Sequence, residues 1–124
     1  MSVENETSPE YPTPLDNAPW ELSPETVHGL IRNQEAFLLL DCRTVMEWED
    51  GSIEGAINLP LRQFSTRFNE LEGHRDKPIV IFCRTGSRSV IVAKFLRMAG
   101  FEHVRSMSGG YEAWKTLPSI TGAS

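Results

Sequence analysis

Cys83 is the residue best placed in this sequence to act as a nucleophile, because it follows an apolar run, 78–82, and opens a short polar loop. The rest of the loop is Arg84, Thr85, Gly86, Ser87, Arg88 and Ser89. Unpaired loop amides and a helix N-terminus stabilise an anion, and the two arginines add fixed positive charge. We expect these groups to lower the pKa of the Cys83 thiol below its usual value of about 8.5, so that the nucleophilic thiolate is present at neutral pH.

The alternative for this loop is an ordinary turn between a strand and a helix, with a buried and inert cysteine. The composite pattern strand–Cys–Arg–x–Gly–x–Arg–Ser–helix favours the catalytic interpretation, since it combines several requirements of an activated thiolate. Gly86 adds the backbone freedom that a tight cradle needs, and its missing side chain lets a substrate approach closely.

The elements that must position the loop alternate between strand and helix. Strands are predicted at 20–22, 37–40, 57–59, 78–82 and 103–107. Helices are predicted at 24–33, 61–71, 90–98 and 111–115. This alternation is typical of an α/β fold, a three-layer α/β/α sandwich around a parallel sheet. Ligands of such sheets gather beyond the carboxyl ends of the strands, which is where Cys83 lies.

The composition favours one globular domain without a large charged surface. Hydrophobic residues make up 40% and charged residues 23% of the 124 residues, and the net charge is −5. We expect an acidic, proline-rich flexible tail at 1–19, a folded domain at 20–117 and a flexible end at 118–124. No basic excess points to nucleic acid as a partner. No apolar run or leader points to a membrane, so a cytoplasmic protein is expected.

Three segments resemble the signatures of the rhodanese family. The segments 41–48 and 51–60 resemble its N-terminal signature, 82–89 its active-site loop, and 109–114 its C-terminal signature. Gly109 and Gly110 in the last segment permit a close turn onto the final helix. By this resemblance the chain is identified as a single-domain, thiosulfate sulfurtransferase-like rhodanese. The resemblance implies a rhodanese-like five-stranded parallel sheet with the strand order 3-2-4-5-1.

The resemblance also implies an enzyme, a transferase that moves sulfane sulfur from thiosulfate or a related small anionic donor to cyanide or a thiol. The sulfur would be carried as a persulfide on Cys83, and neither a metal nor an organic cofactor would be needed. An alternative is a sulfur-relay or regulatory module whose donor or acceptor is a protein. Phosphatases and arsenate reductases of the same fold are another alternative. Their Cys-x5-Arg loop, however, is one residue longer than the Cys83-to-Arg88 spacing.

The six residues after Cys83 are expected to bind the donor through backbone amides, hydroxyl groups and the two guanidinium groups. We expect Asp41, Arg43 and Glu47 to support the site, because an arginine after a strand can be held by neighbouring acids. A direct role of Arg43 in binding substrate is the alternative.

Cys42 follows a predicted strand directly, as Cys83 does. The simpler interpretation is that Cys42 is a buried thiol that points into the core, away from the loop. The alternative uses the implied strand order, in which the two strands are neighbours about 4.8 Å apart. Two cysteines at that spacing could form a disulfide, through which Cys42 would resolve an oxidised Cys83.

Overall fold

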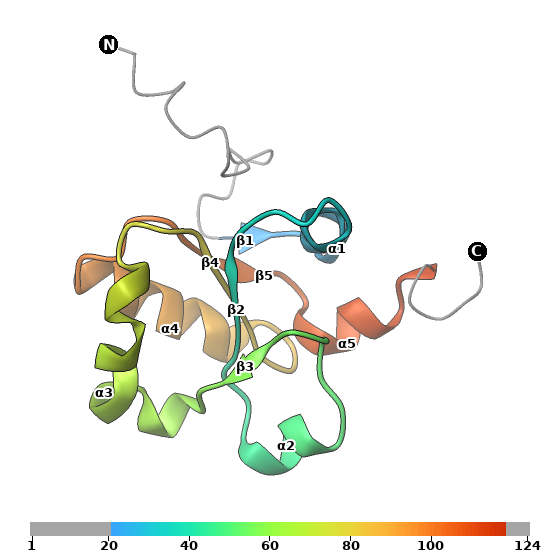
Figure 1. Ribbon diagram of the computed structural model, residues 1–124. Helices are drawn as coiled ribbons and strands as arrows, with labels where there is room; N and C mark the ends of the chain where they lie inside the picture. Colours follow the sequence, from blue (N-terminus) through green and yellow to red (C-terminus); the bar gives the residue numbers. More distant parts are fainter. Residues whose placement is uncertain (1–20, 119–124) are drawn as a thin grey trace.

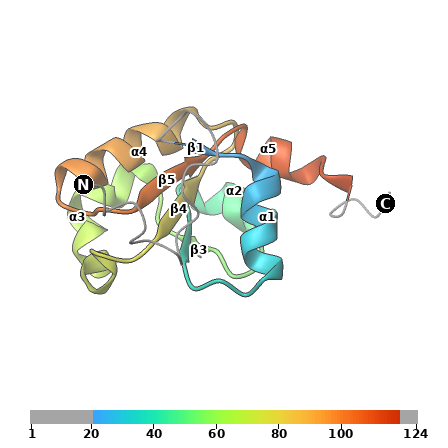
Figure 2. The ribbon, with the colours of Figure 1, turned by 90° about the horizontal axis from the view of Figure 1, so that it is seen from above.

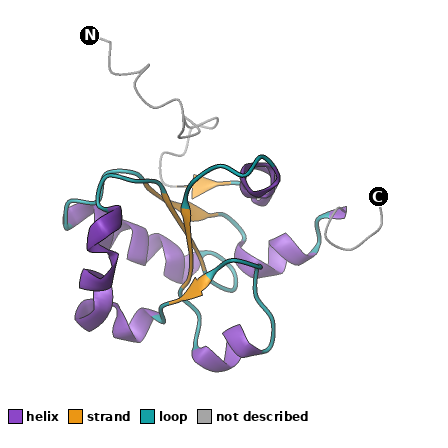
Figure 3. Cartoon of the chain, viewed as in Figure 1, coloured by secondary structure: helices purple, strands orange, loops and turns teal. Residues whose placement is uncertain are grey.

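The computed structural model describes residues 21–118, in which a parallel β-sheet carries helices on both faces (Figures 1 and 3). The strands are β1 (Glu21–Leu22), β2 (Leu38–Asp41), β3 (Ile57–Asn58), β4 (Ile79–Phe82) and β5 (Val104–Met107). They are ordered β1-β5-β4-β2-β3 and all pair in parallel. This confirms the α/β class and the implied strand order. The tail predicted at 1–19, and all of the predicted C-terminal segment except Pro118, lie outside the described residues.

Two groups of helices cover the two faces of the sheet (Figure 2). The first face carries α3 (Phe64–Arg67), α4 (Ser87–Met98) and a 3-10 helix, η3 (Phe68–His74), and the second carries α1 (Pro24–Arg32) and α5 (Gly110–Lys115). Successive strand residues point to opposite faces. Leu40 therefore shares a buried cluster with Leu96 of α4, whereas Leu39 shares one with Trp114 of α5. The predicted three-layer sandwich is confirmed.

The helix predicted at 61–71 is instead broken into three short pieces. A 3-10 turn, η2 (Leu61–Gln63), precedes α3, and η3 follows it. Serine and threonine compete for backbone hydrogen bonds and so weaken a helix interior. The hydroxyl group of Thr66 does so here, donating to the carbonyl of Gln63 at 3.1 Å. The three pieces still bury Phe64 and Leu71 against the sheet.

Two helices near the site begin where the sequence analysis did not place them. α4 begins at Ser87, earlier than the predicted start near residue 90, because Gly86 adopts a φ of 103° and ends the loop as the helix N-cap. A short helix, α2 (Val45–Glu49), was not predicted. Its start is marked by a capping box, in which Thr44 and Glu47 bond each other's backbone amides.

The last helix, α5, approaches the backbone of the candidate loop closely. The amide of Tyr111 donates to the carbonyl of Cys83 at 2.8 Å, and the amide of Glu112 donates to the carbonyl of Arg84 at 3.0 Å. Gly110 directly precedes these two residues and has a φ of 63°, and a Cβ atom there would lie 2.5 Å from the Cys83 carbonyl oxygen. Glycine at this position therefore allows α5 to satisfy the carbonyl groups at the start of the loop.

We expect Gly110→Ala to lower the free energy of unfolding by about 3 kcal/mol, because the positive φ and the backbone overlap both disfavour a side chain. Urea denaturation measures the change. Gly29→Ala in α1 is the matched control, since a Cβ atom there meets no other atom within 4 Å. That control is expected to raise stability by about 0.5–1 kcal/mol. A Gly110→Ala variant at least as stable as the wild type would contradict the proposed close approach.

Candidate active site

The sulfur of Cys83 lies at the floor of the loop that joins β4 to α4. The amides of Gly86 and Ser89 donate to it at 3.0 and 3.4 Å, and the Ser89 hydroxyl oxygen lies 3.6 Å away. The Ser89 hydroxyl oxygen is also 2.7 Å from that of Ser106 on β5. Cys83, Ser89 and Ser106 are all buried. The geometry is that of a sulfur anion surrounded by donors.

Hydrogen bonding lowers the pKa of Cys83 to about 4. The thiol of Cys42 contributes most, burial opposes the shift, and the side chain and amide of Ser89 and the amide of Gly86 add to it. The direction agrees with the sequence prediction. The pKa of Cys83 is lowered mainly by neighbouring hydrogen-bond donors. From the sequence we expected the charges of Arg84 and Arg88 to be important. A nucleophilic thiolate is therefore available at neutral pH.

Cys42 lies beside Cys83, on the same face of the sheet. Asp41 pairs with Phe82 in the β2–β4 register, and the amide of Cys42 continues the ladder with a 2.9 Å bond to the Phe82 carbonyl. The two cysteines share one buried cluster on the face of the sheet under α4. Cys42 is buried as predicted, but the interpretation that it points away from Cys83 is wrong. The hydrogen bond to Cys83 and burial raise the pKa of Cys42, so Cys42 stays protonated.

Asp41 and Arg43 form a buried ion pair directly after β2. The guanidinium group bonds both carboxylate oxygens of Asp41, with the shortest distance 2.7 Å, and donates to the Gly51 carbonyl at 2.6 Å. It also stacks over the ring of Tyr111 in α5, 4.4 Å from its centroid. The Ser52 hydroxyl group donates to Asp41 at 2.7 Å. These contacts join the loop after β2 to α5, which fits the supporting role expected of the pair.

Glu47 contacts Arg88, not Arg43, and so differs from the arrangement expected from the sequence. The two carboxylate oxygens of Glu47 accept hydrogen bonds from the Arg88 guanidinium group at 3.2 and 3.3 Å. Because Glu47 is fixed by the capping box of α2, this helix holds the arginine that ends the candidate loop. Helix α2, which was not predicted, thus positions Arg88, one of the two arginines expected to bind the anionic donor.

The remaining loop side chains lie on the outside of the site. Arg84, Thr85 and Ser87 are exposed. Arg84 lies at a polar cleft of about 290 Å³ that also involves the loop after β2 and helix α5. The cleft is lined by Arg43, Glu47, Asp50, Gly51, Arg84, Tyr111, Glu112 and Lys115. Arg84 therefore faces solvent among charges of both signs, whereas Arg88 is held in one place.

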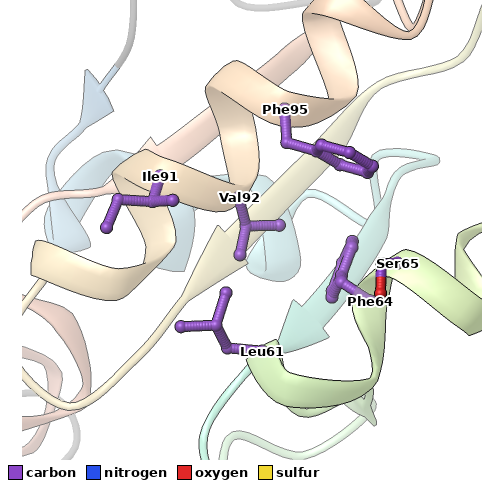
Figure 4. A pocket seen from close by; sticks show the side chains of 6 residues that line it. All are labelled: Leu61, Phe64, Ser65, Ile91, Val92 and Phe95. Atoms are coloured by element: carbon purple, nitrogen blue, oxygen red, sulfur yellow. The ribbon is translucent and has the colours of Figure 1, made fainter.

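An apolar pocket of about 180 Å³ opens between α4 and the η2–α3 segment (Figure 4). Its lining residues are Leu61, Phe64, Ser65, Ile91, Val92 and Phe95. None of these lining side chains is ionisable. Within residues 21–118, no helix is long and apolar enough to cross a membrane, and no three His, Cys, Asp or Glu side chains group as metal ligands.

A cysteine between a strand and a helix at the carboxyl edge of a parallel sheet is placed as nucleophiles of such sheets are placed. The chain matches the family model described as the rhodanese-like domain over residues 23–117. It therefore belongs to this family, as the sequence resemblance indicated.

Proteins named as sulfurtransferases are similar to this chain over most of its length. A sulfurtransferase of Allochromatium vinosum is 33% identical over 94 residues, which are 76% of this chain and 86% of that protein. The thiosulfate sulfurtransferase GlpE of Glaesserella parasuis is 29% identical over 94 residues, covering 76% and 84%. The solved structure of the human single domain sulfurtransferase TSTD1 has a TM-score of 0.67 at 25% identity, covering 79% and 96%. Some other relatives are longer, and the chain spans 24% to 59% of three of them.

The ultraviolet absorbance of the thiolate tests the cause of the low pKa. Because the pKa of Cys83 is about 4, we expect the thiolate to persist down to about pH 5. Cys42→Ala removes the strongest donor and should move the titration to higher pH, whereas Cys42→Ser keeps a hydroxyl donor and should move it less. Cys83→Ser supplies the background without this thiolate. An unchanged midpoint in Cys42→Ala would contradict the proposed hydrogen bond.

Proposed function

We propose that this protein is a thiosulfate sulfurtransferase-like enzyme that moves sulfane sulfur through a persulfide on Cys83. The observation that carries the proposal is a buried cysteine sulfur with a pKa well below its usual range, surrounded by amide and hydroxyl donors at the end of β4. These donors suit both the thiolate that attacks and the anionic sulfur that remains after attack. The named sulfurtransferases among the relatives support the same class of reaction.

In the first half-reaction, the Cys83 thiolate attacks the outer sulfur of thiosulfate or a related anionic donor. A sulfur–sulfur bond forms to Cys83 while the sulfur–sulfur bond of thiosulfate breaks, and its electron pair leaves with sulfite. The backbone amides between Arg84 and Ser89 cradle the transferred sulfur, and the buried hydroxyl group of Ser89 adds a donor. Arg88, oriented by Glu47, attracts the anionic donor, and exposed Arg84 assists at the rim of the site.

In the second half-reaction, an acceptor attacks the outer sulfur of the persulfide, and Cys83 leaves as a thiolate. The acceptor is cyanide or a thiol, either a small molecule or a thiol on a protein partner. A thiol acceptor fits the cytoplasmic setting expected from the sequence, where thiols are kept reduced. Two half-reactions that share one enzyme-bound intermediate give ping-pong kinetics.

The loop favours sulfur transfer over hydrolysis of a phosphoester. A Cys-x5-Arg phosphatase loop would require an arginine at position 89. Ser89 is fully buried there, and its hydroxyl group lies 2.7 Å from Ser106 and 3.6 Å from the Cys83 sulfur. That space holds a small hydroxyl side chain and has no room for a guanidinium group.

Cys83→Ser is expected to abolish sulfur transfer, because a serine hydroxyl remains neutral and cannot carry sulfane sulfur. The assay is thiocyanate formation from thiosulfate and cyanide, with thermal unfolding as the check that the variant is folded. Intact mass after incubation with thiosulfate should show one added sulfur atom on the wild type and none on the variant. Retained activity in a folded variant would refute the role of Cys83.

The proposed part of Arg88 in donor binding predicts that Arg88→Ala raises KM for thiosulfate about tenfold, since a charge-assisted contact is lost. Arg88→Lys should recover part of the loss, because lysine keeps the charge but not the planar guanidinium fork. Glu47→Gln should raise KM less, about threefold, because it only loosens Arg88.

Arg67→Ala is the matched control for these variants. Arg67 also pairs with a glutamate, Glu70, at 2.9 Å, but on α3 and away from the loop. Its removal should leave KM unchanged. An equal rise of KM in the Arg67 and Arg88 variants would show that only the general charge of the protein matters.

A further inference from the structure

We propose that Cys42 and Cys83 form a peroxide-responsive pair, in which Cys42 resolves a sulfenic acid on Cys83 by closing an intramolecular disulfide. This role goes beyond sulfur transfer and does not depend on which donor supplies the sulfur. It would protect Cys83, the proposed sulfur carrier, from irreversible oxidation.

The register of the sheet brings the two cysteines within reach of each other. Leu38 to Asp41 pair one to one with Ile79 to Phe82, and the next residues along the two strands are Cys42 and Cys83. The bond from the Cys42 amide to the Phe82 carbonyl repeats the one from the Leu38 amide to the Pro78 carbonyl, so the register holds up to Cys42. Neighbouring strands lie about 4.8 Å apart, and disulfides join Cα atoms about 4.4–6.8 Å apart.

The direction of the two side chains completes the geometry. Alternate residues of a strand face the same side, and Leu40, Cys42, Ile81 and Cys83 all belong to the cluster under α4. The two side chains therefore lie next to each other on one face of the sheet, in one buried cluster. A disulfide therefore needs only a short approach of the two sulfur atoms, without a change of register.

The chemistry needs one oxidant, a hydroperoxide such as hydrogen peroxide. The Cys83 thiolate attacks one peroxide oxygen, the O–O bond breaks, and hydroxide leaves, so that sulfur loses the two electrons that the peroxide gains. The Cys42 sulfur then attacks the sulfur of the sulfenic acid. The S–O bond breaks, and the departing hydroxide takes the proton of Cys42 and becomes water. A dithiol restores both thiols by exchange.

The environment of Cys42 makes this second step conditional on the first. While Cys83 is a thiolate, the hydrogen bond to it and its negative charge hold Cys42 in the protonated, unreactive form. Conversion of Cys83 to a neutral sulfenic acid removes the thiolate charge and the bond to it, which are two of the causes that raise the pKa of Cys42; burial and Asp41 still raise this pKa, and Arg88 lowers it. Oxidation of Cys83 therefore lowers the pKa of Cys42 and makes its sulfur more nucleophilic at the moment when there is a sulfenic acid to attack.

Peptide mapping of the full chain tests the proposal without any sulfur donor. Wild-type protein is treated with mild hydrogen peroxide, its remaining thiols are blocked, and it is digested without reductant. We expect a peptide that joins Cys42 to Cys83 within one chain and that separates after dithiothreitol. A sulfinic acid on Cys83 beside a free Cys42 thiol, or a Cys83–Cys83 link between two chains, would overturn the proposal.

Cys42→Ser is the informative variant, because it keeps a small hydrogen-bond donor next to Cys83 but cannot form a disulfide. After peroxide and then dithiothreitol, wild-type protein should regain at least about tenfold more of its Cys83 thiol than this variant, in which Cys83 proceeds to sulfinic acid. Circular dichroism shows whether the variant is folded, and if it is not, the wild-type map alone decides. Equal recovery in a folded variant would rule out resolution by Cys42.

Discussion

A sulfur anion at the floor of a loop, shielded from water, needs hydrogen-bond donors on several sides at once. In this protein the donors come from three parts of the fold. Cys42 follows β2, Gly86 lies in the loop itself, and Ser89 is in the first turn of α4. None of these donors carries a net charge. The low pKa of Cys83 therefore depends on accurate placement of short side chains and amides, and much less on a large local field.

The surrounding structure can be understood as the means of keeping those donors in place. The in-register pairing of β2 with β4 sets Cys42 against Cys83, and the contact of Ser89 with Ser106 ties α4 to β5. Gly110 lets the amides of α5 bond the carbonyl groups that follow β4. The loop after β4 is thus held on one side by β5, through Ser106, and on another by the backbone amides of α5. Such support limits the positions that the Cys83 sulfur can take.

The sequence was sufficient to predict the five strands in their order along the chain and the position of Cys83 at the end of β4, because β-branched runs, glycines and a strand-to-helix cysteine are local signals. The direction of Cys42 could not be predicted, since it depends on a strand register that only pairing decides. The partner of Glu47 was misjudged because α2 was missed, although its capping box could be read from Thr44 and Glu47. Ser106 was also missed, a polar residue of β5, the strand that pairs with β4.

The pairing of the first described strand with the last has a consequence for the newly made chain. β1 lies beside β5, with Glu21 opposite Ser106, and α5 completes the back of the loop only from Gly110 onward. While the ribosome is still adding these residues, the segment that carries Cys83 has neither Ser106 nor the α5 amides around it. The Cys42 thiol and the amides that lower the pKa of Cys83 all precede residue 90, but β5 and α5, which brace the loop that holds them, are made later. The complete site can therefore form only after α5 has been synthesised.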